Sequence, residues 1–154
     1  MLNTFKGIYM KTRWNDKAPI GPAASISDIY YENITMYAPE QYAIWIGPAQ
    51  QTGQPCSLGW NIAVRPECRM SGYQTWSNIV LKDVTIYNPK NSPGVLFGNT
   101  SNPIQGLVFD NVVVVNPGSN PWGDDFYQPC TGINGIARGK TNPIPPCFKD
   151  ETEK

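Results

Sequence analysis

Three segments of the chain, residues 26–39, 76–89 and 104–117, share one spacing of hydrophobic positions. In each segment an aliphatic residue recurs at the fourth, ninth and eleventh positions, and an Ala or Asn followed by Pro closes the segment. The matched residues are Ile29, Ile79 and Leu107; Ile34, Val84 and Val112; and Met36, Ile86 and Val114. A repeat of this kind indicates stacked coils whose hydrophobic core continues from one coil to the next.

Shorter apolar stretches predict a second strand in each coil. Residues 42–47 and 94–99 follow the closing prolines of the first two segments at nearly the same distance. Residues 5–14 also read as a short strand, with Ile8 and Met10 on one side and Tyr9 and Lys11 on the other. Near-continuous apolar runs such as residues 112–115 are typical of strands buried in parallel sheets. We therefore predict an all-β fold, a parallel β-helix (solenoid) of about four coils.

The repeat is interrupted once and then ends. Pro39 and Pro89 are 50 residues apart, whereas Pro89 and Pro117 are 28 apart, so 22 residues are inserted in the earlier coil. We expect one domain over residues 1–154, with a long inserted loop at 48–75. Residues 118–148, rich in Pro, Gly and Asn, are predicted to form a C-terminal cap over the last coil, and residues 149–154 a charged tail.

The four cysteines form two local pairs, Cys56 with Cys68 and Cys130 with Cys147, each around an irregular stretch. A crosslink helps most where a loop lacks a core of its own, so we predict two local disulfides. The alternative is four buried thiols in a reducing compartment, and the sequence alone does not choose among the three possible connectivities. Zinc is not expected, because there is no histidine and no Cys-x-x-Cys spacing, and no cofactor is predicted.

The charge pattern excludes two classes of binding partner. Twelve basic and twelve acidic residues give a net charge of zero, without long runs of one sign, which argues against non-specific binding to nucleic acid or to anionic membranes. No apolar run approaches the roughly 20 residues that span a bilayer. Residues 1–6 contain no apolar stretch of the signal-peptide type, so we expect an intracellular chain or the mature or truncated part of a longer one.

The segment Gly7-Ile8-Tyr9-Met10-Lys11-Thr12, followed by a Gly-containing loop and the strand at 27–36, resembles a segment of glycoside hydrolase family 28, the polygalacturonases. That family carries Gly-x-Arg-Ile-Lys-Thr before a strand of Asn-Ile-x-Phe-x-Asn-Ile-x-Met character. The likeness covers about residues 5–117 and is to the C-terminal coils of a right-handed parallel β-helix of the pectin-lyase-like fold. It implies a secreted protein and polyuronides such as pectin as the substrate class.

The resemblance also implies a substrate-binding role for Lys11, which matches the family's lysine that holds a sugar carboxylate. Tyr9 stands where the family has arginine, and Arg13 lies on the same strand face as Lys11 and would assist it. The alternative is that Lys11 and Arg13 are solvated basic residues on an exposed strand. Aromatic side chains would also stack on sugar rings if they face outward, although most are expected in the core or in loops. These are Tyr9, Trp14, Trp45, Trp60, Trp76 and Trp122.

No catalytic residue is predicted in this chain. The family's hydrolytic aspartates, in an Asn-Thr-Asp motif and an Asp-Asp pair, and its Gly-His-Gly histidine lie before the Arg-Ile-Lys segment, whereas this chain has no histidine and no Asn-Thr-Asp. Its own pair, Asp124-Asp125, lies after Lys11 and is read as a polar turn. Inverting hydrolysis needs two carboxyl groups across the scissile bond, so activity would require missing N-terminal coils or a partner chain.

Two other functions stay open. One is a structural or assembly β-helix, whose open first coil would be covered by another chain or by missing N-terminal coils. The other is a non-catalytic module that binds acidic polysaccharide. Two sequons are present, Asn33-Ile34-Thr35 inside an expected strand and Asn99-Thr100-Ser101 after one, so Asn99 is the predicted glycosylation site. Recurrent asparagines are expected to stack as amide ladders, namely Asn33, Asn78, Asn88, Asn111 and Asn116.

Overall fold

A computed structural model describes residues 1–12, 23–50, 56, 68–91, 93–118, 127 and 129–152. Over these residues the chain forms nine β-strands and no helix, which confirms the expected all-β class. Arg13, Trp14, Trp60, Trp122 and the pair Asp124-Asp125 lie outside the described residues, as does most of the predicted inserted loop.

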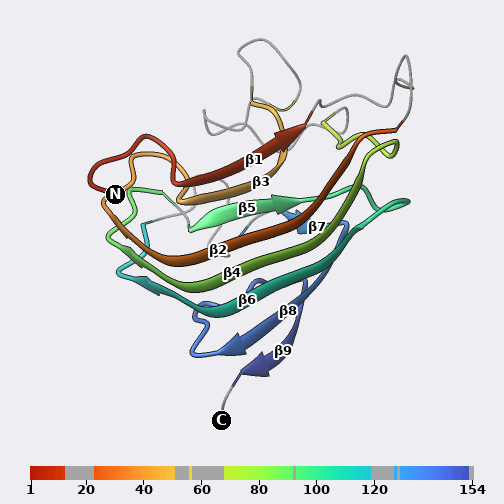
Figure 1. Ribbon diagram of the computed structural model, residues 1–154. Coiled ribbons are helices and arrows are strands. Elements are labelled where there is room, and N and C mark those ends of the chain that lie inside the picture. Colours follow the sequence, from red (N-terminus) through yellow and green to blue (C-terminus); the bar gives the residue numbers. More distant parts are fainter. Residues whose placement is uncertain are drawn as a thin grey trace.

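The strands form two sheets in which every pair is parallel (Figure 1). The four-stranded sheet contains β1 (Ile8–Thr12), β3 (Ile44–Pro48), β5 (Gly94–Phe97) and β7 (Cys130–Thr131), in that order. The five-stranded sheet contains β2 (Ser25–Tyr37), β4 (Thr75–Tyr87), β6 (Ile104–Val115), β8 (Ile133–Gly139) and β9 (Phe148–Thr152). From β1 to β8 the chain alternates between the sheets, and in Figure 1 the arrowheads of β1 and β5 point opposite to those of β6 and β8. This order is compatible with a β-helix-like fold.

The pairing register follows the sequence repeat. Ile29 pairs with Ile79, and Ile79 pairs with Leu107, as the shared spacing predicts. At the strand ends Tyr37 pairs with Tyr87, 50 residues later, and Tyr87 pairs with Val115, 28 residues later. The 22 inserted residues are therefore accommodated between β3 and β4 without a shift in the register of the five-stranded sheet.

The main hydrophobic core draws residues from both sheets. In β4 and β6 the repeat positions are fully buried, as at Ile79, Val84 and Leu107. In β2 the equivalent Ile29 and Ile34 are only half-buried, because β2 lies at the edge of its sheet. The first coil therefore leaves part of its apolar face uncovered by the described residues.

Each long strand of the five-stranded sheet bends at residues with positive φ. Asp28 and Asn33 in β2 have φ of 59° and 57°, and Asn78 and Asp83 occupy the same places in β4. Asn, Asp and Gly tolerate this left-handed region better than other residues, which explains their recurrence at the bends. The stacked bends are joined by side-chain hydrogen bonds from Asn78 Nδ2 to Asp28 Oδ1 at 3.1 Å and from Asn111 Nδ2 to Asp83 Oδ1 at 2.8 Å.

The predicted amide ladders are thus confirmed at several positions, with aspartates as some of the acceptors. At the strand ends Asn116 Nδ2 donates to Asn88 Oδ1 at 3.1 Å. In every one of these bonds the amide nitrogen of a later coil donates to an oxygen of the coil before it. The ladders therefore have a single direction along the stack.

Asn111 offers a test of these bends, because it has φ of 56° and also accepts a hydrogen bond from Lys140 N at 2.9 Å. Asn111→Ala is expected to destabilise the protein by about 2 kcal/mol, through lost hydrogen bonds and a strained backbone. Asn111→Gly loses the same hydrogen bonds but tolerates positive φ, so it is expected to be less damaging by about 1 kcal/mol. Urea unfolding of both variants measures the difference, and equal losses would contradict a left-handed bend at this position.

The C-terminal region differs from the sequence expectation. Within the predicted cap at 118–148, β8 pairs with β6, and the predicted tail at 149–154 contains most of β9, which pairs with β8. The repeat is hidden here because Gly135 and Ala137 stand opposite Leu107 and Phe109. The ring of Phe148 occupies the space that a side chain at 135 would fill, so a later residue completes this layer of the core.

Both predicted disulfides are present, Cys56–Cys68 and Cys130–Cys147. Cys130 belongs to β7, and Cys147 immediately precedes β9, so the second disulfide joins the two sheets at this end of the molecule. Disulfides persist in oxidising compartments, and their presence is consistent with an extracellular protein.

Candidate functional site

The outward face of β1 carries the residues that the sequence singles out. Ile8 and Met10 are buried in the core with 3% and 7% exposure, so alternation along the strand turns Tyr9 and Lys11 to the other side. Tyr9 is half-buried and Lys11 is exposed. This division of the strand confirms the predicted faces.

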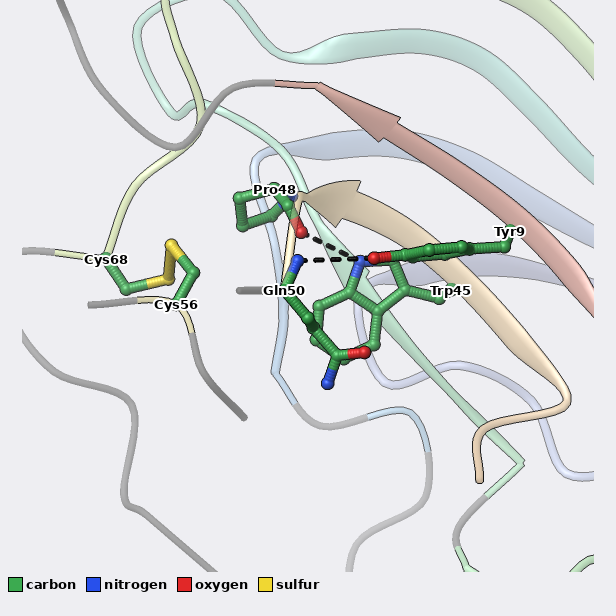
Figure 2. The surroundings of a disulfide bond; sticks show 6 residues. All are labelled: Tyr9, Trp45, Pro48, Gln50, Cys56 and Cys68. Carbon is green, nitrogen blue, oxygen red and sulfur yellow. Dashed lines mark hydrogen bonds between the residues drawn. A yellow bond between two sulfur atoms is a disulfide. The ribbon is translucent and has the colours of Figure 1, made fainter. Parts of the chain in front are cut away.

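The ring of Tyr9 is held by a second, smaller apolar cluster on this side of the sheet (Figure 2). It meets the ring of its register partner Trp45 edge-on, with centroids 6.1 Å apart. Gln50 N donates to Tyr9 Oη at 3.2 Å, and Trp45 Nε1 donates to Pro48 O at 3.0 Å. Cys56 and Cys68 belong to the same cluster. Tyr9 is therefore a fixed aromatic surface rather than a freely rotating side chain.

The predicted aromatic candidates divide accordingly. Trp45 and Trp76 are buried, with 0% and 1% exposure, so they serve as core anchors and present no face to a ligand. Trp14, Trp60 and Trp122 lie outside the described residues. Among the named candidates within the described residues, Tyr9 alone retains exposed surface.

Two lysines lie against Tyr9. Lys6 Nζ is 4.1 Å from the ring centroid and Lys11 Nζ is 5.3 Å from it, both within the range of cation–π attraction. The ion pairs between described residues involve neither lysine, so no described carboxylate neutralises them. Partial burial, and secondarily the positive charge of Lys11, lower the pKa of Lys6. Burial raises the pKa of Tyr9, so its phenol is neutral near pH 7.

This charge arrangement predicts a pH response. Lys11→Ala is expected to raise the pKa of Lys6 toward that of an ordinary lysine, because a neighbouring like charge is removed, while the effect of burial remains. In the unaltered protein the pKa of Lys6 is lowered, so it loses its proton at lower pH than an unperturbed lysine and its attraction for an anion weakens over that range. NMR titration of the lysine ε-carbons measures this pKa, and an unchanged Lys6 titration in Lys11→Ala would contradict the coupling.

The sequence analysis named Lys11 and Tyr9 as expected substrate contacts but did not name Lys6, which the structure places beside Tyr9. Lys6 precedes the strand and belongs to no repeat position, so periodicity gives no signal for it. Arg13, the third predicted contact, lies outside the described residues, and its role stays a prediction.

A separate groove of about 460 Å³ lies beyond the end of β5. Asn99, the predicted glycosylation site, lines this groove, but its side chain is already engaged. Asn99 Nδ2 donates to Met70 O at 2.8 Å, and Asn99 Oδ1 accepts from Ser101 N and Asn102 N at 2.9 and 3.0 Å. Glycosylation at Asn99 stays a prediction. The Asn99 side chain is hydrogen-bonded to the backbone of the turn that follows it.

Comparisons of the chain with protein-family models, with curated proteins and with solved structures found no match. The site must therefore be interpreted from its own chemistry. Across the described ranges there is no cluster of three or more His, Cys, Asp or Glu suited to a metal ion. In the same part of the chain, no helix is long and apolar enough to cross a membrane.

The β1 face combines two kinds of group. Two ammonium groups offer strong hydrogen-bond donors to an anion, and the Tyr9 ring that both contact offers a flat apolar surface. The groups named at this face are lysines and a neutral phenol, which supply no pair of carboxyl groups for glycosidic hydrolysis. The arrangement suits a ligand that has both a carboxylate and a flat C–H surface.

Proposed function

We propose that this protein is a secreted, right-handed parallel β-helix of the polygalacturonase-like kind that binds acidic polysaccharide through Lys6, Tyr9 and Lys11. The observation that carries the proposal is the pair of lysines against one fixed ring, with no described carboxylate to neutralise them. The β-helix part is supported by two parallel sheets that the chain visits alternately from β1 to β8.

The ligand class follows from these groups. A polyuronide such as polygalacturonate combines a ring with C–H groups on its face and one carboxylate on each sugar. The ring of Tyr9 would support the sugar face, while Lys6 and Lys11 would donate to carboxylates. Exposed charge pairs are individually weak, so a single sugar would bind poorly and an oligosaccharide better.

Binding is favoured over hydrolysis for this chain. The resemblance to polygalacturonases rests on the segment that includes Lys11, and the structure turns Lys11 outward on β1. The groups at this face, however, are two lysines and a phenol, which supply no pair of carboxyl groups for hydrolysis. A face with these groups is expected to bind polyuronide without itself cleaving it.

Calorimetric titration with an oligogalacturonate tests the proposal. Lys11→Ala and Lys6→Ala are each expected to weaken binding about three- to tenfold, because each removes one charged donor beside the ring. Lys140→Ala is the matched control, since Lys140 is an exposed lysine in the turn after β8 and should leave affinity unchanged. Binding should also weaken as salt is raised, because screening acts on exposed charges.

The fully methyl-esterified oligosaccharide separates charge from shape, because it keeps the sugar face but has no carboxylate. It is expected to bind more weakly than the free acid. Equal affinity for the two oligosaccharides, or equal losses in Lys11→Ala and Lys140→Ala, would overturn the proposed site. Release of reducing sugar ends by the purified chain would overturn the assignment of binding without cleavage.

A further inference from the structure

The sequon Asn33-Ile34-Thr35 lies on the outermost strand of the five-stranded sheet. We propose that Asn33 carries an N-linked glycan and that this glycan shields the part of the β2 edge that residues 1–3 do not cover. The proposal does not depend on the polysaccharide-binding function. It also reverses the order expected from sequence, which placed the better acceptor at Asn99.

Local geometry makes Asn33 accessible. It occupies a bend of β2 with φ of 57°, and both Asn33 and Thr35 are exposed. Its side chain takes part in no hydrogen bond with the described residues. The amide of Asn99, in contrast, is bonded to Met70 and holds a turn through its oxygen. Strand pairing is therefore not an obstacle at Asn33, because the bend turns its side chain to solvent.

Asn33 begins a column of stacked bend residues but forms no hydrogen bond within it among the described residues. Asn33 stacks on the column that continues through Asp83 and Asn111, where Asn111 Nδ2 donates toward the preceding coil. The next member of the column, Asp83, has a carboxylate that accepts from Asn111 and has no donor for Asn33. On the other side of β2, residues 1–3 pair with Thr35 and Tyr37, beyond the bend at Asn33. A glycan on Asn33 would therefore break no hydrogen bond of the ladder between the described residues.

The required chemistry is that of the secretory pathway. The donor is an oligosaccharide linked to a lipid pyrophosphate. A bond forms between Asn33 Nδ2 and the anomeric carbon of the first sugar, the bond from that carbon to the pyrophosphate oxygen breaks, and the amide nitrogen loses one proton. The two disulfides are consistent with the same oxidising compartment.

A glycan at Asn33 would protect the edge of β2 from pairing with another chain. An open strand edge with half-buried apolar side chains, such as Ile29 and Ile34, is a template for pairing with another chain. A bulky, hydrated glycan at the bend obstructs such pairing. The glycan and a further stacked coil are therefore mutually exclusive occupants of this edge.

The test is secretion of the full chain from a eukaryotic host, followed by intact mass measurement before and after treatment with a peptide N-glycosidase. We expect a glycan mass that is lost in Asn33→Gln and in Thr35→Val, and kept in Asn99→Gln and in Thr35→Ser, which preserves the sequon. Thr35→Val retains a β-branched residue and serves if the bend does not tolerate glutamine. A glycan lost only in Asn99→Gln, or a secreted, disulfide-bonded protein without any glycan, would overturn the proposal.

Sedimentation of the two forms tests the shielding. The glycosylated protein is expected to be monomeric, and Thr35→Val is expected to self-associate more strongly at the same concentration. If both forms have the same association state, the glycan does not protect the edge. A defined oligomer of the secreted protein with Asn33 unmodified would instead assign this edge to a second copy of the chain.

Discussion

Phe109→Ala is expected to destabilise the protein by about 3–5 kcal/mol, the usual range for removal of a buried phenylalanine. Phe109 is fully buried in β6, between Leu81 of β4 and Ala137 of β8 in the register. Its ring meets Tyr127 at 5.8 Å and Phe148 at 5.0 Å between centroids. Its register partner in the next coil is the small Ala137, so loss of the ring leaves a cavity at this level of the core.

The measurement is urea unfolding with both disulfides oxidised. Val108→Ala is the matched control, because Val108 lies next to Phe109 on the same strand but is only half-buried and faces the other side. We expect the control to lose about 1 kcal/mol or less. Similar losses in the two variants would mean that Phe109 does not occupy the inner face of the sheet.

Removal of the Cys130–Cys147 disulfide is expected to have the second largest effect, about 3 kcal/mol, on the chain-entropy estimate for a loop of 17 residues. This bond ties β7 of one sheet to the start of β9, the terminal strand of the other. Without it, β9 is held to the sheet by its pairing with β8, by packing of Phe148 and by the exposed ion pair between Arg138 and Glu151. We therefore expect the double variant Cys130→Ser, Cys147→Ser to open first at β9.

Hydrogen exchange together with urea unfolding separates the local from the global effect. Amides of β9 and β8 should lose protection in the double variant, while those of β4 and β6 keep most of theirs. The comparison is Cys56→Ser, Cys68→Ser, which removes a disulfide of 12-residue separation beside β3 and should leave β9 protected. Loss of β9 protection in both double variants would contradict a local role for Cys130–Cys147.

The repeat in the sequence was sufficient to predict strand pairing. Ile29, Ile79 and Leu107 share a register because each must turn inward in successive coils, and the spacing of the closing prolines located the insertion. The cysteine pairs were also predictable, since each brackets a stretch without apolar periodicity. These features were predictable because apolar residues must face the core and because cysteine pairs crosslink loops that lack a core of their own.

The remaining features depend on contacts between residues far apart in sequence. The hydrophobic repeat is not visible at Gly135, because Phe148 from β9 supplies the core side chain at this level. Lys6 lies beside Tyr9 although it belongs to no strand. Asn33 is exposed because a left-handed bend interrupts what reads as a continuous strand. None of these contacts leaves a periodic signal.

Chemical-shift mapping of the ¹⁵N-labelled protein with an oligogalacturonate tests the proposed site most directly. We expect the largest chemical-shift changes at Lys6, Tyr9, Lys11 and Gln50, whose amide donates to the Tyr9 hydroxyl. We also expect these changes to be strongly reduced in Lys11→Ala. Shifts centred on the groove at Tyr73 and Asn99, with the β1 face unaffected, would contradict the proposed site.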